Sequence, residues 1–71
     1  MRFRELLPGQ RFVFLDAKGN VMPRWGWDGP FVKLGAGTYC RPTDYERGRE
    51  YKVQHTSPNA RVRAVKEEES Q

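Results

Sequence analysis

The hydrophobic positions of this chain alternate with polar ones over short runs, and residues typical of turns separate these runs. The clearest run is QRFVFLD at residues 10–16, which places Phe12 and Phe14 on one face of an extended chain and Val13 and Leu15 on the other. Because both faces are apolar, this run predicts a strand that the rest of the chain covers on both sides.

Four further main strands are predicted from the same pattern, and a short return strand begins at Val21 and Met22. Glycine, proline, asparagine and aspartate between the runs predict turns. The main strands are expected at residues 30–34, 38–41, 51–55 and 60–65, and the turns at residues 16–20, 35–37 and 56–59.

The last predicted strand alternates most cleanly. Ala60, Val62 and Ala64 share one face, and Arg61 and Arg63 share the other. This pattern indicates a strand with an apolar inner face and a basic outer face.

Helical periodicity is confined to RFRELL at residues 2–7, which Pro8 and Gly9 end. We expect one helical or 3₁₀ turn there. Residues 42–50, PTDYERGRE, match a capping box at Thr43–Glu46, but Gly48 follows too soon for a helix, so we interpret this segment as a polar loop.

Together these elements predict an all-β fold, a small five-stranded antiparallel SH3-like barrel with one N-terminal helical turn. Closure into a barrel removes exposed strand edges from a chain too short for two large sheets. An OB-fold is the nearest alternative, although residues 42–50 are short for its helix. The domain is expected to span residues 1–66, followed by a disordered acidic tail at residues 67–71.

The start of the chain, F-x-x-L-x-x-G-x-x-F from Phe3 to Phe12, and the run FVKL at residues 31–34 resemble a group of short uncharacterised proteins of bacteria and their phages. The resemblance covers most of residues 3–65. It implies a small β fold, with no known activity and no functional residues to carry over.

Composition limits the chemistry. In 71 residues there is one cysteine, Cys40, and one histidine, His55, so neither an intrachain disulfide nor a structural zinc site is expected. We interpret Cys40 as a small buried hydrophobe and His55 as a partly exposed strand or turn residue. A lone cysteine fits a reducing compartment, and no signal peptide or apolar membrane span is visible, which predicts a cytoplasmic protein without a membrane partner.

The net charge of +4 hides an asymmetry. Residues 67–71 hold three of the nine acids, so residues 1–66 carry 13 basic and 9 − 3 = 6 acidic side chains, a balance of +7. Nine of the bases are arginine. Because the guanidinium fork suits phosphate and carboxylate, this predicts a nucleic acid or an acidic protein surface as the partner.

No residue pattern indicates catalysis. The aspartates fall in predicted turns, and the glycines at residues 35–37 lack the lysine and helix of a phosphate-binding loop. We therefore expect a non-enzymatic binding module without cofactor or metal.

Three sets of residues are candidates for its binding surface. In the first, WGW at residues 25–27, we expect one indole to cap the core and the other to be at least half exposed, the alternative being that both pack on the barrel. The second set alternates tyrosine and arginine over residues 45–51, and the third is the pair of arginines on the last strand, which closure would bring near Arg11. Each of these two sets could instead be merely solvated. The candidates are Arg24, Trp25, Trp27, Tyr45, Arg47, Arg49, Tyr51, Arg61 and Arg63.

Two functions fit these residues. The first is binding of single-stranded or duplex nucleic acid, with arginines on phosphates and aromatic rings stacked on bases. The second is a protein-binding adaptor or inhibitor, such as a phage-encoded modulator of a host enzyme, since tryptophan, tyrosine and arginine are also enriched at protein interfaces. A monomer and a weak homodimer are both compatible with the sequence.

Overall fold

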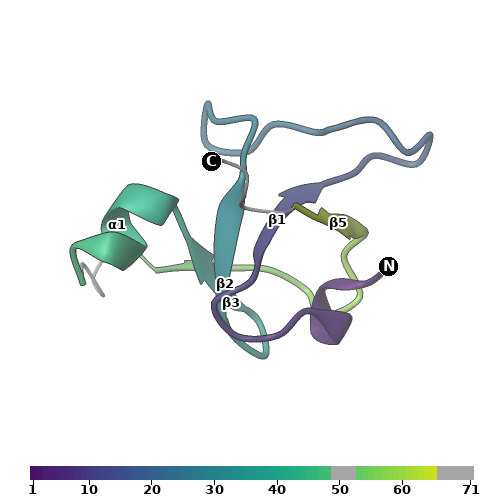
Figure 1. The fold of residues 1–71 in the computed structure, drawn as a ribbon. Coiled ribbons are helices and arrows are strands. Elements are labelled where there is room, and N and C mark those ends of the chain that lie inside the picture. The colour runs from purple at the N-terminus through teal and green to yellow at the C-terminus, as the bar shows by residue number, and fades with distance from the viewer. Residues whose placement is uncertain (49–52, 66–71) are drawn as a thin grey trace.

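The structure is a computed structural model that describes residues 1–48 and 53–65. It contains mostly strands with little helix (Figure 1). The elements are η1 (a 3₁₀ turn, Phe3–Glu5), β1 (Arg11–Phe14), β2 (Phe31–Gly35), β3 (Thr38–Cys40), α1 (Pro42–Glu46), β4 (Gln54–His55) and β5 (Val62–Ala64).

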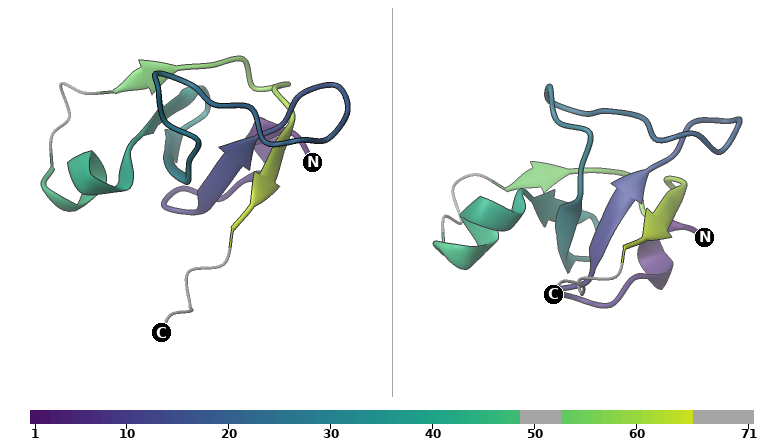
Figure 2. Two further views of the ribbon diagram at one scale, coloured as in Figure 1. Left: turned by 90° about the horizontal axis from the view of Figure 1, so that it is seen from above. Right: turned by 45° about the horizontal axis from the view of Figure 1, so that its top comes forward.

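The strands form one antiparallel five-stranded sheet in the order β4-β3-β2-β1-β5. The last strand returns to pair with the first, with Phe12 opposite Ala64 and Phe14 opposite Val62, which confirms that these strands are neighbours. The sheet is not closed, because among the described residues no pairing joins β4 to β5. Accordingly α1, which follows β3, and β5 lie toward opposite edges of the sheet (Figures 1 and 2).

The inner face of the sheet carries an aromatic core. Alternation along the strands directs Phe12 and Phe14 of β1, Phe31 of β2 and Tyr39 of β3 to this face, where Phe3 of η1 joins them. Most of these rings meet edge to face, with centroids 5.1 to 6.4 Å apart. Such contacts stabilise a core beyond its buried area, by about 0.5–1.5 kcal/mol per pair.

The opposite face is also covered, as the apolar pattern of residues 10–16 predicts. Val13, Val32 and Cys40 are buried there, although they lie outside the aromatic cluster. Gly29 approaches β1 so closely that a Cβ atom at this position would lie 2.8 Å from Cγ1 of Val13. The short helix α1 contacts β2.

Lys33 is the one buried charged residue in the described part of the chain. Its Nζ donates hydrogen bonds to the carbonyl oxygens of Phe3 (3.1 Å), Arg4 (3.4 Å) and Leu6 (2.6 Å). These oxygens belong to η1 and the residue that ends it, so Lys33 ties the N-terminal turn to β2.

The predicted loop at residues 42–50 is wrong in its first half, because Pro42–Glu46 form one helical turn, α1. Proline fits the first helical position because its fixed φ suits a helix and its missing N–H needs no partner there. The N-cap residue is Arg41, and its side chain makes no capping hydrogen bond. Thr43 lies inside the helical turn, so it does not serve as the N-cap of a capping box.

Several strands are shorter than predicted. The predicted run 10–16 contains β1, and Val21 makes only an isolated bridge to Leu15. The predicted strand 51–55 contains β4, but residues 51–52 lie outside the described part of the chain, as does the predicted tail 67–71.

Candidate binding surfaces

Residues 24–27 form a tight hairpin turn, here called the tryptophan turn. The backbone N–H of Arg24 donates to the carbonyl of Trp27, and the N–H of Trp27 donates to the carbonyl of Arg24, each at 2.9 Å. Both central residues adopt left-handed conformations, with φ of 57° at Trp25 and 70° at Gly26. Glycine adopts this conformation readily, but for a bulky side chain it is an uncommon and strained one.

Both indoles lie outside the core and are anchored by their N–H groups. Trp25 is 62% exposed, and its Nε1 donates to the hydroxyl of buried Tyr39 at 2.8 Å. Trp27 is 40% exposed, and its Nε1 donates to the carbonyl of Pro30 at 3.0 Å. We expected one indole to cap the core and the other to be at least half exposed. Trp25 is more than half exposed, but neither indole belongs to the core.

Two arginines hold the tryptophan turn from either side. A nitrogen of Arg41 donates to the carbonyl oxygen of Trp25 at 2.8 Å, and its guanidinium carbon lies 5.8 Å from the ring centre of Trp27. The guanidinium carbon of Arg24 lies 4.1 Å above the ring of Phe14, a cation–π contact at the border of the core. The turn is therefore fixed at several points.

Beside Trp25 lies an open cleft of about 340 Å³, here called the aromatic cleft. Aromatic rings and hydrogen-bonding side chains both line it. Among the described residues, the side chains of Thr43 and Gln54 make no hydrogen bond. Its lining is Trp25, Phe31, Tyr39, Arg41, Thr43, Asp44 and Gln54.

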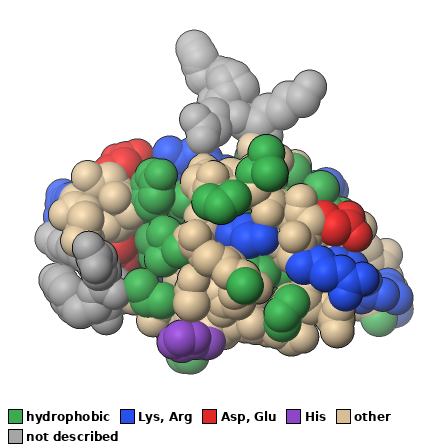
Figure 3. Space-filling model, turned by 90° about the horizontal axis from the view of Figure 1, so that it is seen from below, with side chains coloured by type: hydrophobic (Ala, Val, Ile, Leu, Met, Phe, Trp, Pro, Cys, Tyr) green, Lys and Arg blue, Asp and Glu red, His purple; other side chains and the backbone are tan. Residues whose placement is uncertain are grey.

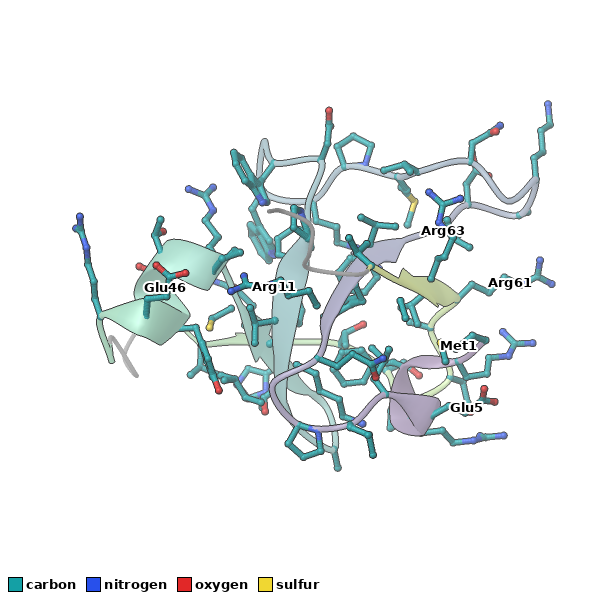
Figure 4. The ribbon with its side chains drawn as sticks, viewed as in Figure 1. Met1, Glu5, Arg11, Glu46, Arg61 and Arg63 are labelled. Carbon is teal, nitrogen blue, oxygen red and sulfur yellow. The ribbon has the colours of Figure 1, made fainter. Side chains whose placement is uncertain are left out.

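A second surface, here called the basic edge, lies beside β5 and η1. All of its side chains are exposed. Within the part of the chain that the structure describes, none of them forms an ion pair, whereas Arg11 pairs with Glu46. Figure 4 shows Arg61 and Arg63 projecting on the side of Met1, far from Glu46 on α1. Figure 3 views the molecule from below and shows Lys and Arg side chains toward its right end, with an acidic side chain next to them. The basic edge consists of Arg2, Arg4, Lys18, Arg61 and Arg63.

Neutral groups hold the basic edge together. Arg2 and Arg61 are partners in an antiparallel bridge, so two like charges stand side by side. Arg2 donates to the carbonyl of Asn59 (3.0 Å), Arg4 donates to the Asn59 side chain, and Arg61 donates to the carbonyl of Ala17 (3.3 Å). A hollow of about 290 Å³ lies here, lined by Met1, Arg2, Leu15, Asp16, Gly19 and Arg61.

The predicted binding residues are divided between separate places. Arg24, Trp25 and Trp27 form the tryptophan turn; Tyr45 lies on α1 with Arg47 at its end, both exposed; Arg61 and Arg63 belong to the basic edge. Arg49 and Tyr51 lie outside the described residues.

Arg11 does not turn toward the basic edge. Although its strand pairs with β5, its guanidinium faces Glu46 on α1 at 3.5 Å. The sequence analysis also missed Arg41 and Tyr39 at the cleft and Arg2, Arg4 and Lys18 at the basic edge. Alternation through 38–41, predicted as a strand, would have placed Tyr39 and Arg41 on the same face.

Comparison with protein-family models, curated proteins and solved structures finds no match for this chain. The resemblance to short bacterial and phage proteins therefore stays a prediction. Within residues 1–48 and 53–65, no helix has the length and apolar character to cross a membrane, and no group of three or more histidine, cysteine or acidic side chains is placed to hold a metal.

Proposed function

We propose that the protein is a non-enzymatic binding module for single-stranded nucleic acid and that its basic edge holds the phosphate backbone. The observation that carries this proposal is the bridge between Arg2 and Arg61 beside a hollow of about 290 Å³. Like charges placed directly opposite each other destabilise a β pairing. A bound phosphate removes this repulsion, and guanidinium groups offer it paired hydrogen bonds.

The number of unpaired cations supports a polyanion rather than one small anion. Arg4, Lys18 and Arg63 extend the surface beyond the Arg2–Arg61 bridge. Among the described residues none of the three forms an ion pair, and one carboxylate, that of Asp16, lines the hollow. An extended row of phosphates fits this arrangement. A single-stranded ligand is favoured because Trp25 exposes a ring on which an unpaired base can stack.

The return of β5 to β1 supports an SH3-like barrel that is left open between β4 and β5. The single buried thiol of Cys40 supports a reducing, cytoplasmic location.

The test is a titration of labelled mixed-sequence oligonucleotides of roughly 12 nucleotides, single-stranded and duplex, followed by fluorescence anisotropy. Between about 50 and 200 mM salt, log K should fall linearly with log salt, with a slope of about −0.7 for each single-strand phosphate contacted. The double variant Arg61→Gln/Arg63→Gln should bind more weakly and lower the slope by about 1.4.

Arg47→Gln is the matched control, because Arg47 is an exposed arginine at the end of α1, away from the basic edge. This variant should bind like the wild type. Absence of binding at the lowest salt, or equal losses in the control and the double variant, would refute the proposal.

The aromatic cleft favours a second candidate, a protein-binding adaptor or inhibitor, including a modulator of a host enzyme. The guanidinium of Arg41 and the rings of Trp25 and Tyr39 line this cleft, and tryptophan, tyrosine and arginine are typical of protein hot spots. Two results together would support this candidate: the wild type binds no oligonucleotide, and it captures a protein partner that Trp25→Ala does not capture.

A further inference from the structure

We infer that the aromatic cleft is a subsite for a single unpaired nucleobase bearing an exocyclic amino group. This inference rests on the proposed function and deepens it, because it assigns to the cleft one base of the bound single strand. Four features of the cleft carry it: the fixed ring of Trp25, its engaged N–H, the side chain of Gln54 and the carboxylate of Asp44.

The ring of Trp25 is held in place before any ligand arrives. The tryptophan turn, the hydrogen bond to Tyr39 and the hydrogen bond from Arg41 fix its backbone and its indole. The left-handed φ of 57° is strained for this residue, yet the ring remains 62% exposed. Strain of this kind persists at binding sites, where it fixes a side chain in the orientation that a ligand needs.

The hydrogen bond to Tyr39 decides what Trp25 can offer to a ligand. An indole has one N–H donor, and this donor is already engaged at 2.8 Å. The exposed remainder is an aromatic face, which recognises a flat partner by stacking. Stacking of one base on one aromatic side chain contributes about 5- to 150-fold in affinity.

Gln54 supplies recognition of the base edge. It lines the same cleft from β4, and within the described residues its amide has no hydrogen-bond partner. A glutamine amide pairs with an amino group and an adjacent ring nitrogen through one acceptor and one donor. Cytosine and adenine present this pair of groups.

Asp44 adds selectivity as an acceptor. Its carboxylate lines the cleft, and such a group accepts hydrogen bonds from an amino group but offers no donor to the carbonyl oxygen O4 of thymine. Cytosine is therefore preferred to thymine, a pyrimidine of similar size.

The test compares labelled oligo(dC), oligo(dT) and an abasic oligomer of the same length by anisotropy. The wild type should prefer oligo(dC) to oligo(dT) by about fivefold or more and bind the abasic oligomer most weakly. Gln54→Leu should weaken oligo(dC) binding without changing the salt slope. Trp25→Leu should weaken oligo(dC) binding by about tenfold, and Trp25→Phe should restore most of the loss, because phenylalanine keeps an aromatic face.

Arg47→Gln is the matched control, since Arg47 is exposed at the end of α1 and does not line the cleft. It should bind as the wild type does. Trp27→Phe removes the second of the two tryptophans, so it isolates Trp25 as a fluorescent reporter whose emission should be quenched by oligo(dC).

If Arg61→Gln/Arg63→Gln weakens binding while Trp25→Leu and Gln54→Leu leave affinity and base preference unchanged, the cleft inference is wrong and the proposed function stands. If no oligonucleotide binds the wild type, the proposed function is refuted, and the nucleobase subsite with it.

Discussion

Replacing Lys33 with methionine tests how this small domain holds its N-terminal segment. Lys33 is 5% exposed, and its ammonium donates to the carbonyls of Phe3, Arg4 and Leu6. Methionine keeps most of the apolar stem but removes the donors. The carbonyl oxygens of Phe3 and Leu6 then lose a charged partner at 3.1 and 2.6 Å, whereas the contact with Arg4, at 3.4 Å, is already long.

The magnitude follows from these two good hydrogen bonds. A hydrogen bond to a charged group contributes about 1.5–3 kcal/mol, so their loss costs about 3–6 kcal/mol in the folded state. Relief from burying the ammonium offsets part of this loss. We expect the free energy of unfolding to fall by about 2–4 kcal/mol, a large share of the roughly 4–10 kcal/mol typical of a chain of this length.

Urea unfolding followed by far-ultraviolet circular dichroism measures the effect. With a slope of about 1 kcal/mol per molar urea, the midpoint of Lys33→Met should fall by about 2 M or more. Lys18→Met is the control, because Lys18 is exposed in the 16–20 turn, and its stability should stay within about 0.5 kcal/mol of the wild type. Equal midpoints for the two variants, or a more stable Lys33→Met, would contradict the anchoring role.

Three further outcomes are expected. Trp25→Gly should be more stable than Trp25→Ala by about 1 kcal/mol in urea unfolding, because glycine adopts a positive φ without strain; equal stability would argue against the left-handed turn. Burial, and then the nearby charge of Asp44, raise the pKa of the Cys40 thiol above its usual value of 9.0, so the folded state keeps a proton that the unfolded chain loses. Stability should therefore decline as pH rises above about 9, and Cys40→Ala should remove that part of the pH dependence; identical pH profiles for both proteins would contradict it. Deleting residues 67–71, which carry three glutamates, should tighten oligonucleotide binding at low salt, and unchanged affinity would show that the tail does not compete.

Local patterns predicted much of the sheet. Alternation identified β1, the β2–β3 hairpin and β5 because a strand buried on one face repeats its apolar side chains every second residue. The helical turn α1 was missed, since a single turn has too few residues for a periodicity, and its packing against β2 is a long-range contact. Alternation also places Lys33 on the inner face with Phe31. A lysine is tolerated there because the carbonyl oxygens of Phe3 and Leu6 accept hydrogen bonds from its ammonium group.

The binding surfaces were less predictable because the chain assembles them from distant segments. Grouping residues by closeness in the sequence joined Tyr45 with Arg47 and Arg61 with Arg63. The fold instead pairs Arg2 with Arg61, and the hydrogen bond from Arg61 to Ala17 brings the 16–20 turn beside them. Composition gives the number of cationic side chains, but it does not show which of them form ion pairs. The tertiary structure shows that Arg11 pairs with a carboxylate.

Both surfaces depend on one cross-strand pair. Lys33 of β2 and Tyr39 of β3 lie opposite each other in the sheet. Lys33 holds η1, and with it the segment that carries Arg2, whereas Tyr39 holds the indole of Trp25. A change at this pair should therefore disturb the basic edge and the aromatic cleft together, while exposed substitutions affect them one at a time. This difference separates a loss of binding that comes from a loosened scaffold from one that comes from a missing contact.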